Sequence, residues 1–136
     1  MEEHTTIMPN SILTGGRDGV ITIKKYSGIS SHCALMCGTH DYRKSIHLMH
    51  QDDFPQDIIR GNITIEEHSM IGCNSVIMPG INIGEGVRVG VHSFVNRNLD
   101  PWTMYIGSPA RSIGPVDKEN VLNSLENFKR LIENGI

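Results

Sequence analysis

His40 is the residue whose type and position best suit acid–base chemistry. It stands in the motif CGTHDY and begins residues 40–61, a polar, histidine-rich stretch. The reference pKa of an imidazole is about 6.5, so a histidine can take a proton from an attacking group near neutral pH. Asp41 and Tyr42 follow and could bind a polar acceptor, or could simply begin a solvated loop. Because a connection of about 20 residues in a compact domain is usually functional, His40 is a candidate general base beside an acceptor pocket.

Two histidines and two cysteines raise the alternative of a metal site: His32, Cys33, Cys37 and His40. Neighbouring residues of a strand point to opposite faces, so this spacing does not bring all four to one ion, and no metal is predicted. Together with Cys73 the cysteines are odd in number and form no CxxC pair. This indicates free thiols in a reducing, cytoplasmic setting, and we expect small inward or corner residues rather than nucleophiles.

The elements that must position these residues show a period of six. The aliphatic residues that keep this step are Ile65, Ile71, Ile77, Ile83, Val89 and Val95. Four places after each comes a small or apolar residue: Ser69, Ser75, Ile81, Val87, Ser93 and Leu99. A helix repeats near 3.6 residues and a half-buried strand near 2, so neither produces a strict six. The pattern predicts a parallel β-helix in which three six-residue units close one triangular coil of about 18 residues, aliphatic side chains inside.

The same phase appears upstream. Ile23, Ile29 and Leu35 are six apart, followed at the fifth positions by Ser27, Cys33 and Thr39. An earlier pair, Ile7 and Leu13, is offset by four residues, which predicts a bulge or a longer corner at the motif GGRDG. Between Leu35 and Ile65 the repeat stops, so we interpret residues 40–61 as a loop that leaves the prism.

A helix is predicted after the repeats. Residues 117–133 carry Asp117 as a capping residue and an apolar face formed by Val121, Leu125, Phe128 and Ile132. We expect this helix to cover the open end of the prism or to pack on a neighbour. The predicted domains are therefore a β-helix over residues 1–116 and a C-terminal helix over residues 117–136.

Charge and hydropathy exclude several classes of function. The formal net charge is −3, from 12 basic and 15 acidic residues, so no strong field is available for nucleic acid or an anionic membrane. No apolar run approaches the roughly 20 residues of a membrane span, and the first ten residues do not have the pattern of a signal peptide.

These motifs together resemble the hexapeptide-repeat acyltransferases of the left-handed β-helix fold. The resemblance is strongest in CGTHDY, in residues 69–95 and in LDPWTMYIGSPAR, and it points to the galactoside, maltose and serogroup sugar O-acetyltransferases. It implies an all-β, left-handed parallel β-helix, a homotrimer with active sites between subunits, and transfer of acetyl from acetyl-CoA to a hydroxyl of a saccharide or nucleotide-sugar. His40 matches the catalytic histidine of the family, which would act as general base in a direct transfer.

The resemblance also assigns binding residues. It places Asn10 and Asp18 where the family holds its sugar. The positions it implies along the coenzyme A arm and at the nucleotide end are Gly72, Cys73, Gly90, Val91, Asn96, Arg97 and Arg111. Two features depart from the family. Gly114 replaces a second C-terminal basic residue, and the N-terminal helical segment of the galactoside and maltose enzymes is not seen.

Three other interpretations remain open. An amino-sugar N-acetyltransferase would have an amine as its nucleophile and need no histidine base. A γ-type carbonic anhydrase-like protein would bind zinc through three histidines between subunits; here we expect His68 and His92 on outward faces instead. A non-catalytic scaffold would bind no coenzyme A.

Overall fold

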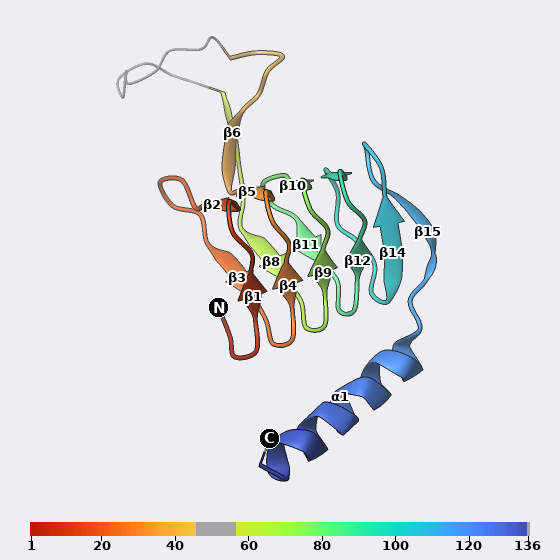
Figure 1. The fold of residues 1–136 in the computed structure, drawn as a ribbon. Helices are drawn as coiled ribbons and strands as arrows, with labels where there is room; N and C mark the ends of the chain where they lie inside the picture. The colour runs from red at the N-terminus through yellow and green to blue at the C-terminus, as the bar shows by residue number, and fades with distance from the viewer. Residues whose placement is uncertain (46–56, 136) are drawn as a thin grey trace.

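The chain forms a three-sided prism of stacked coils. The computed structural model describes residues 1–45 and 57–135. Its first face contains β1 (Thr6–Ile7), β4 (Gly28–Ile29), β9 (Met70–Ile71), β12 (Arg88–Val89), β14 (Thr103–Ile106) and β15 (Arg111–Pro115). The second face contains β2 (Ile12–Thr14), β5 (Ala34–Met36), β10 (Val76–Ile77) and β13 (Phe94–Val95). The third contains β3 (Ile21–Ile23), β8 (Ile63–Ile65) and β11 (Asn82–Ile83). All pairs within these faces are parallel except β14–β15, so the predicted parallel β-helix is confirmed (Figure 1).

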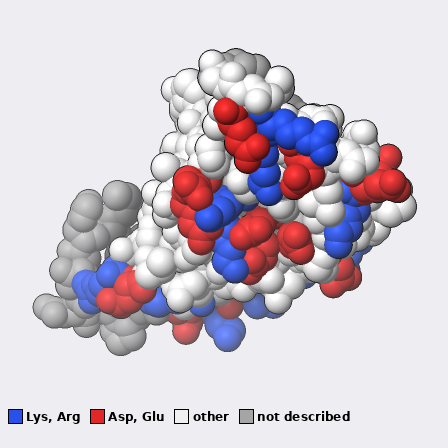
Figure 2. All heavy atoms as spheres, turned by 90° about the horizontal axis from the view of Figure 1, so that it is seen from below, with Lys and Arg blue, Asp and Glu red and all other residues white. Residues whose placement is uncertain are grey.

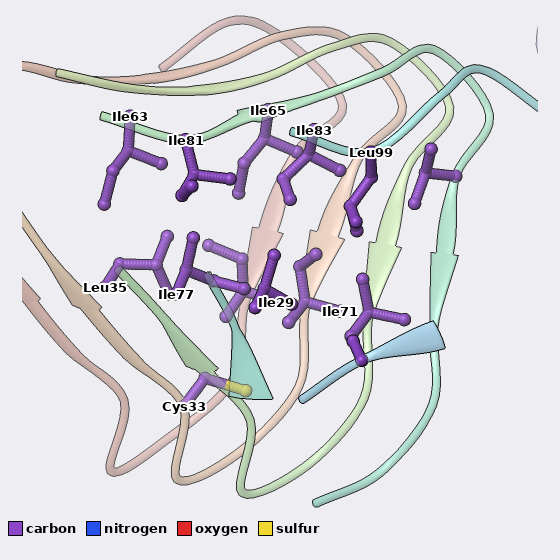
Figure 3. Packing of buried hydrophobic residues seen from close by; sticks show 14 of the residues in the cluster. Ile29, Cys33, Leu35, Ile63, Ile65, Ile71, Ile77, Ile81, Ile83 and Leu99 are labelled. Atoms are coloured by element: carbon purple, nitrogen blue, oxygen red, sulfur yellow. The ribbon is translucent and has the colours of Figure 1, made fainter. Parts of the chain in front are cut away.

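The predicted inward residues form the core. Ile65, Ile71, Ile77 and Ile83 have no exposed surface, and aliphatic side chains from the three walls point into a common interior (Figure 3). The small residues at the fifth positions are buried as well, and their hydroxyls bond to backbone at the corners: the Ser69 hydroxyl donates to Gly84 O at 2.8 Å. A polar atom inside an apolar prism is thereby satisfied, which explains why serine is tolerated there.

Residues 18 apart stack on one another, with two local departures. Ile71 pairs with Val89 and Ile77 with Val95. In the first coil the spacing is four residues longer, as Ile7 pairs with Ile29. The extra residues form the Gly15–Gly19 turn, closed by a 2.8 Å hydrogen bond from Gly19 N to Gly15 O. The longer corner predicted at GGRDG is confirmed.

The second departure is the excursion, the loop predicted at residues 40–61, and its predicted boundaries need correction. Strand β6 (Gly38–His40) pairs antiparallel with β7 (Ile58–Arg60), and together they form an arm that projects from the prism (Figure 1). Thr39 therefore lies on the arm rather than inside a coil, because antiparallel pairing satisfies its backbone outside the stack. Residues 46–56 of the expected loop lie outside the described residues.

The corners carry residues with a left-handed backbone. The corner residues with positive φ are His4, Asn10, Tyr26, His32, His68, Asn74, His92 and Trp102, together with Gly80 and Gly86. From Tyr26 onward, each of them lies three places after an inward aliphatic residue. Outside glycine, asparagine and histidine are among the residues that adopt this conformation most readily, so several histidines of this chain have a conformational role.

At the corner between the third and first faces these residues stack their rings. Tyr26 lies between His4 and His68, with both centroid distances 5.3 Å, and Trp102 follows at 6.1 Å from His68. Gly86 is required between them, because a Cβ there would lie 2.3 Å from the Trp102 ring. The prediction that His68 is on an outward face is wrong, since this stack leaves it only 8% exposed. His92 is exposed, as predicted.

Helix α1 (Lys118–Glu133) runs along this same corner. Asp117 caps it, accepting a 3.0 Å hydrogen bond from Asn120 N. The Lys118 ammonium lies 5.0 Å from the centroid of the Trp102 ring, and Phe128 meets the His4 ring edge-on. The helix thus passes beneath the prism from its last coil to its first instead of covering the open end (Figure 1). Among the described residues, no helix is long and apolar enough to cross a membrane.

Charges of both signs are mixed on the surface. Figure 2, a view from below, shows basic and acidic side chains side by side. Lys24 pairs with Glu66 at 2.6 Å, and Lys25 pairs with Glu3 at 2.7 Å. This face presents no broad field of one sign, in agreement with the charge balance of the sequence.

Replacing one inward isoleucine should test the core. Ile71→Ala removes a fully buried side chain from a coil fixed on both sides, so we expect the free energy of unfolding to fall by about 2–5 kcal/mol. Met70→Ala, on the same strand but 53% exposed, is the matched control and should change stability by about 0.5 kcal/mol or less. Urea unfolding measures both. Equal effects of the two variants would contradict the assignment of the faces.

Candidate functional site

His40 lies at the end of β6, at the corner between the second and third faces. In the register of the arm Gly38 is opposite Arg60 and His40 is opposite Ile58. Alternation along the strands puts these four residues on one side of the arm. There they border a hollow of about 200 Å³, lined by Gly16, Gly38, Thr39, His40, Ile58 and Arg60. The half-buried imidazole therefore faces a space beside the ordered scaffold.

A second hollow, of about 240 Å³, lies next to the first. Its lining residues are Gly15, Asp18, Gly19, Cys37, Arg60, Gly61 and Asn62. The two hollows share Arg60, so the arm and the 15–19 turn bring Asp18 and His40 into one region. Arg60 and Asn62 were not identified from the sequence. The one sequence feature that could have identified them is their position at the end of the excursion, where the six-residue repeat resumes.

Asp41 and Tyr42 hold the turn that follows His40. Asp41 Oδ1 accepts hydrogen bonds from Arg43 N at 3.1 Å and Arg43 Nε at 3.2 Å. This contact with the guanidinium, aided by the backbone N–H, lowers the pKa of the Asp41 carboxyl below its usual value. The Asp41 side chain is only 12% exposed. The Tyr42 side chain is exposed, and its hydroxyl lies 3.2 Å from Thr39 Oγ1. The Asp41 carboxylate is thus engaged within the arm, whereas Tyr42 is open to solvent.

Asn10 lies at a different corner from Asp18 and His40. It has φ of 63° at the corner between the first and second faces, in the column that continues with His32, Asn74 and His92. The expected pair Asn10 and Asp18 is therefore not brought together within one protomer.

The residues predicted along the coenzyme A arm gather at this first–second corner. Gly72 donates to Val89 O at 2.8 Å, and a Cβ on Gly72 would lie 2.7 Å from Val91 N. Glycine is thus required by the close approach of the coils, not by a positive φ. Next to it, Cys73 is half-buried and Val91 is 58% exposed, 18 residues further along. Gly90 stacks above Gly72, so Gly72, Cys73, Gly90 and Val91 form one shallow surface.

Cys33 lies under this surface and is no candidate nucleophile. It is 1% exposed, and its thiol donates to Gly72 O at 3.2 Å. Burial raises the pKa of the Cys33 thiol, and the neighbouring Cys73 acts in the same direction. The thiolate is therefore disfavoured. All three cysteines are free thiols, as predicted.

The predicted nucleotide-end residues are divided between two places. Asn96 and Arg97 are exposed and follow β13 at the second–third corner. Arg111 is exposed at the start of β15, next to Ala110, whose N–H bonds to Phe94 O at 2.8 Å. Among the described residues, no group of three His, Cys, Asp or Glu side chains could hold a metal ion.

Comparisons with known proteins agree with the six-residue repeats and with the resemblance to sugar acyltransferases. Residues 62–97 match the family described as Bacterial transferase hexapeptide (six repeats). Over 104 residues the chain is 30% identical to a dTDP-4-amino-4,6-dideoxy-D-glucose acyltransferase of Escherichia coli, covering 74% of this chain and 53% of the relative. The chain thus spans about half the length of that curated relative.

Solved structures agree with the fold. AntD, an N-acyltransferase from Bacillus cereus in complex with dTDP and 3-hydroxybutyryl-CoA, superposes with a TM-score of 0.85 at 29% identity, covering 93% of this chain and 68% of AntD. A maltose O-acetyltransferase from Clostridium difficile 630 has a TM-score of 0.63 at 19% identity, covering 85% and 68%, which shows the fold alone.

The role of Asp41 in the arm can be tested by hydrogen exchange. Asp41→Asn removes the charge that Arg43 holds, so we expect faster exchange of the Lys44 and Ser45 amides, which donate to Asp41 O. Asp100→Asn, at an exposed position on the last coil, is the control.

The pH dependence follows from the same contact. Because the folded-state pKa of Asp41 is lowered, its contribution is present above the pKa of the unfolded chain and is lost as pH falls through the folded value. Protection of the two amides in wild-type protein should therefore decrease in acid. Protection that is the same in Asp41→Asn and wild-type protein would contradict this role.

Proposed function

We propose that this chain, whose residues 62–97 are hexapeptide repeats of the bacterial transferase family, transfers an acyl group from acyl-coenzyme A to the amino group of a nucleotide-linked sugar. The resemblance to hexapeptide-repeat sugar acyltransferases noted in the sequence is confirmed. The observation that supports an amine acceptor is the 104-residue match to a dTDP-amino-sugar acyltransferase. A match that covers 74% of this chain is long enough to include the arm as well as the coils. A left-handed winding of the coils is part of the same proposal.

The chemistry requires little beyond positioning and one base. The amine nitrogen attacks the thioester carbonyl, a C–N bond forms, the C–S bond breaks, and coenzyme A leaves as the thiol. His40 would take the proton that the nitrogen loses and return it to the departing sulfur. No acyl-enzyme is needed, which agrees with a Cys33 thiol that is buried and hydrogen-bonded. The 200 Å³ hollow beside His40 is where the acceptor would lie.

Acetylation of a sugar hydroxyl is the second candidate. The half-buried His40 imidazole favours it, because an alcohol attacks a thioester poorly without a base. In this version acetyl-CoA is the donor and the same hollow receives the hydroxyl. The chemistry of the product separates the two candidates: alkaline hydroxylamine cleaves an ester and leaves an amide intact.

The active site is expected between subunits of a homotrimer. His40 stands at the second–third corner of the prism, whereas Gly72, Cys73, Gly90 and Val91 share the first–second corner. Two different corners of one prism cannot face the same thioester, but corners of neighbouring prisms can. Closed threefold symmetry makes three equal contacts of this kind.

Coenzyme A would extend along the first–second corner of one subunit. Its pantetheine arm is a chain of amides, and amides can pair with backbone groups of the coils near Gly72 and Gly90. Its anionic end would be bound by Arg111, and by Arg97 with Asn96 from the second–third corner of the neighbouring subunit. A cytoplasmic location and the absence of a resident metal belong to the same proposal.

Replacing His40 tests the base. His40→Ala and His40→Asn should lower kcat by about 100-fold or more, because a lost general base typically costs about 10²–10⁴ in rate. Binding of acyl-coenzyme A and the oligomeric state should be unchanged. Steady-state kinetics on a panel of nucleotide-linked amino sugars and saccharides gives the measurement. Near-normal kcat on the preferred acceptor would show that the nucleophile needs no base from His40.

Mixing two inactive variants tests the shared site. Val91→Trp should block the first–second corner through an exposed position, and His40→Ala removes the base at the other corner. In mixed trimers some interfaces pair an intact corner of each kind, so activity should return to about a quarter of wild type after equal mixing and reassembly. Trimers re-formed from each variant alone are the control. No recovery in verified mixed trimers would place the whole site within one subunit.

A further inference from the structure

Arg60 separates the two hollows beside the arm. It lines the hollow of His40 and also the hollow of Asp18 and Asn62. Among the described residues that line either hollow, it is the one permanently cationic side chain. It is exposed at the end of β7, where the arm rejoins the prism. A charge held at such a boundary can bind a group that extends from one hollow into the other.

The register of the arm leaves room beside the guanidinium. Gly38 lies opposite Arg60, and a Cβ on Gly38 would have only Ile58 Cγ2 near it, at 4.0 Å. His40 is the diagonal neighbour of Arg60 on the same side of the arm. A ligand that contacts the His40 imidazole can therefore reach Arg60 across the uncovered backbone of Gly38.

The second hollow has polar groups on its wall. The Asn62 Oδ1 atom accepts a 3.0 Å hydrogen bond from Val20 N, which orients the side-chain amide and leaves its NH₂ group to donate. Asp18 supplies a carboxylate that can accept from an N–H group. A donor and an acceptor of this kind suit a nucleoside base or ribose better than a second anion.

We propose that Arg60 binds the diphosphate of the acceptor, so that the sugar lies over His40 and the nucleoside extends toward Asp18 and Asn62. The guanidinium forms forked hydrogen bonds to phosphate oxygens, a geometry that a lysine ammonium does not reproduce. The order follows from the chemistry, because the reacting sugar must be on the His40 side of Arg60. This inference rests on the proposed function and makes Arg60 the residue that selects nucleotide-linked acceptors over free sugars.

Direct binding tests this role without acyl transfer. Isothermal titration calorimetry would compare a thymidine diphosphate, a uridine diphosphate and unphosphorylated thymidine on wild-type protein, Arg60→Gln and Arg60→Lys. Arg60→Gln should weaken binding of the preferred diphosphate by about 10–100-fold, with Arg60→Lys between it and wild type. Binding of thymidine and of acyl-coenzyme A should be unchanged by either variant.

Arg111→Gln is the matched control, because it removes the same charge from the site proposed for coenzyme A. It should weaken acyl-coenzyme A and leave the diphosphates unaffected. Wild-type affinity of Arg60→Gln for diphosphates, or no binding of either diphosphate to wild-type protein, would overturn the inference. Activity on nucleotide-linked amino sugars is measured separately. If the protein acylates these sugars while Arg60→Gln binds diphosphates with wild-type affinity, the proposed function stands and the role of Arg60 fails. If the Arg60 effect is found but no sugar is acylated, the binding site stands and the function fails.

Discussion

The structure depends on one constraint, the stacking of coils in a common register. Within a two-residue strand there are no internal partners, so backbone donors bond to the adjacent coil, as Met70 N does to Val87 O and Val76 N to Ser93 O. Each coil therefore fixes the position of the next. Because every coil encloses part of one common interior, inward positions are restricted to a few aliphatic residues and fifth positions to small or aliphatic ones, such as Ser69 and Ile81. The side chains on the outer faces and at the corners are not restricted in this way and can differ in chemical type.

The sequence predicted the parts of the fold that repeat. Ile71 and Val89 were assigned to the interior because they keep the strict period of six residues. The period is strict because an unsuitable residue at such a position would disturb both neighbouring coils. The antiparallel pairing of Gly38–His40 with Ile58–Arg60 occurs once and has no period to reveal it. The ring stack around His68 also escaped prediction, because it joins residues from different coils at a corner where almost any side chain can point outward.

The candidate site was predicted in part for a related reason. His40 was identified because a specific motif surrounds it, and the structure places it beside a hollow. Arg60 was not identified, because its place between the two hollows arises only when the excursion returns alongside the 15–19 turn. The resemblance assigned Asn10 and Asp18 to one sugar site, but they lie at different corners of the prism, on either side of β2. In the proposed function, the distinction between an amine and a hydroxyl acceptor would depend on a few contacts in the hollows, and such contacts leave no pattern along the chain.

The interruption of the repeat by the arm has a consequence for the order of folding. Coils after the arm pair residues 18 apart, whereas β3 and β8 pair Ile23 with Ile65 across the whole excursion. Closing a longer loop costs more chain entropy, and contacts distant in sequence form more slowly. The local coils from β8 to β13 should nucleate first and provide a template on which the N-terminal coils are added. The 15–19 turn belongs to these N-terminal coils, whereas β6 and β7 pair across a separation close to that of the later coils. The hollows around Arg60 are therefore completed only when the N-terminal coils are added beside the arm.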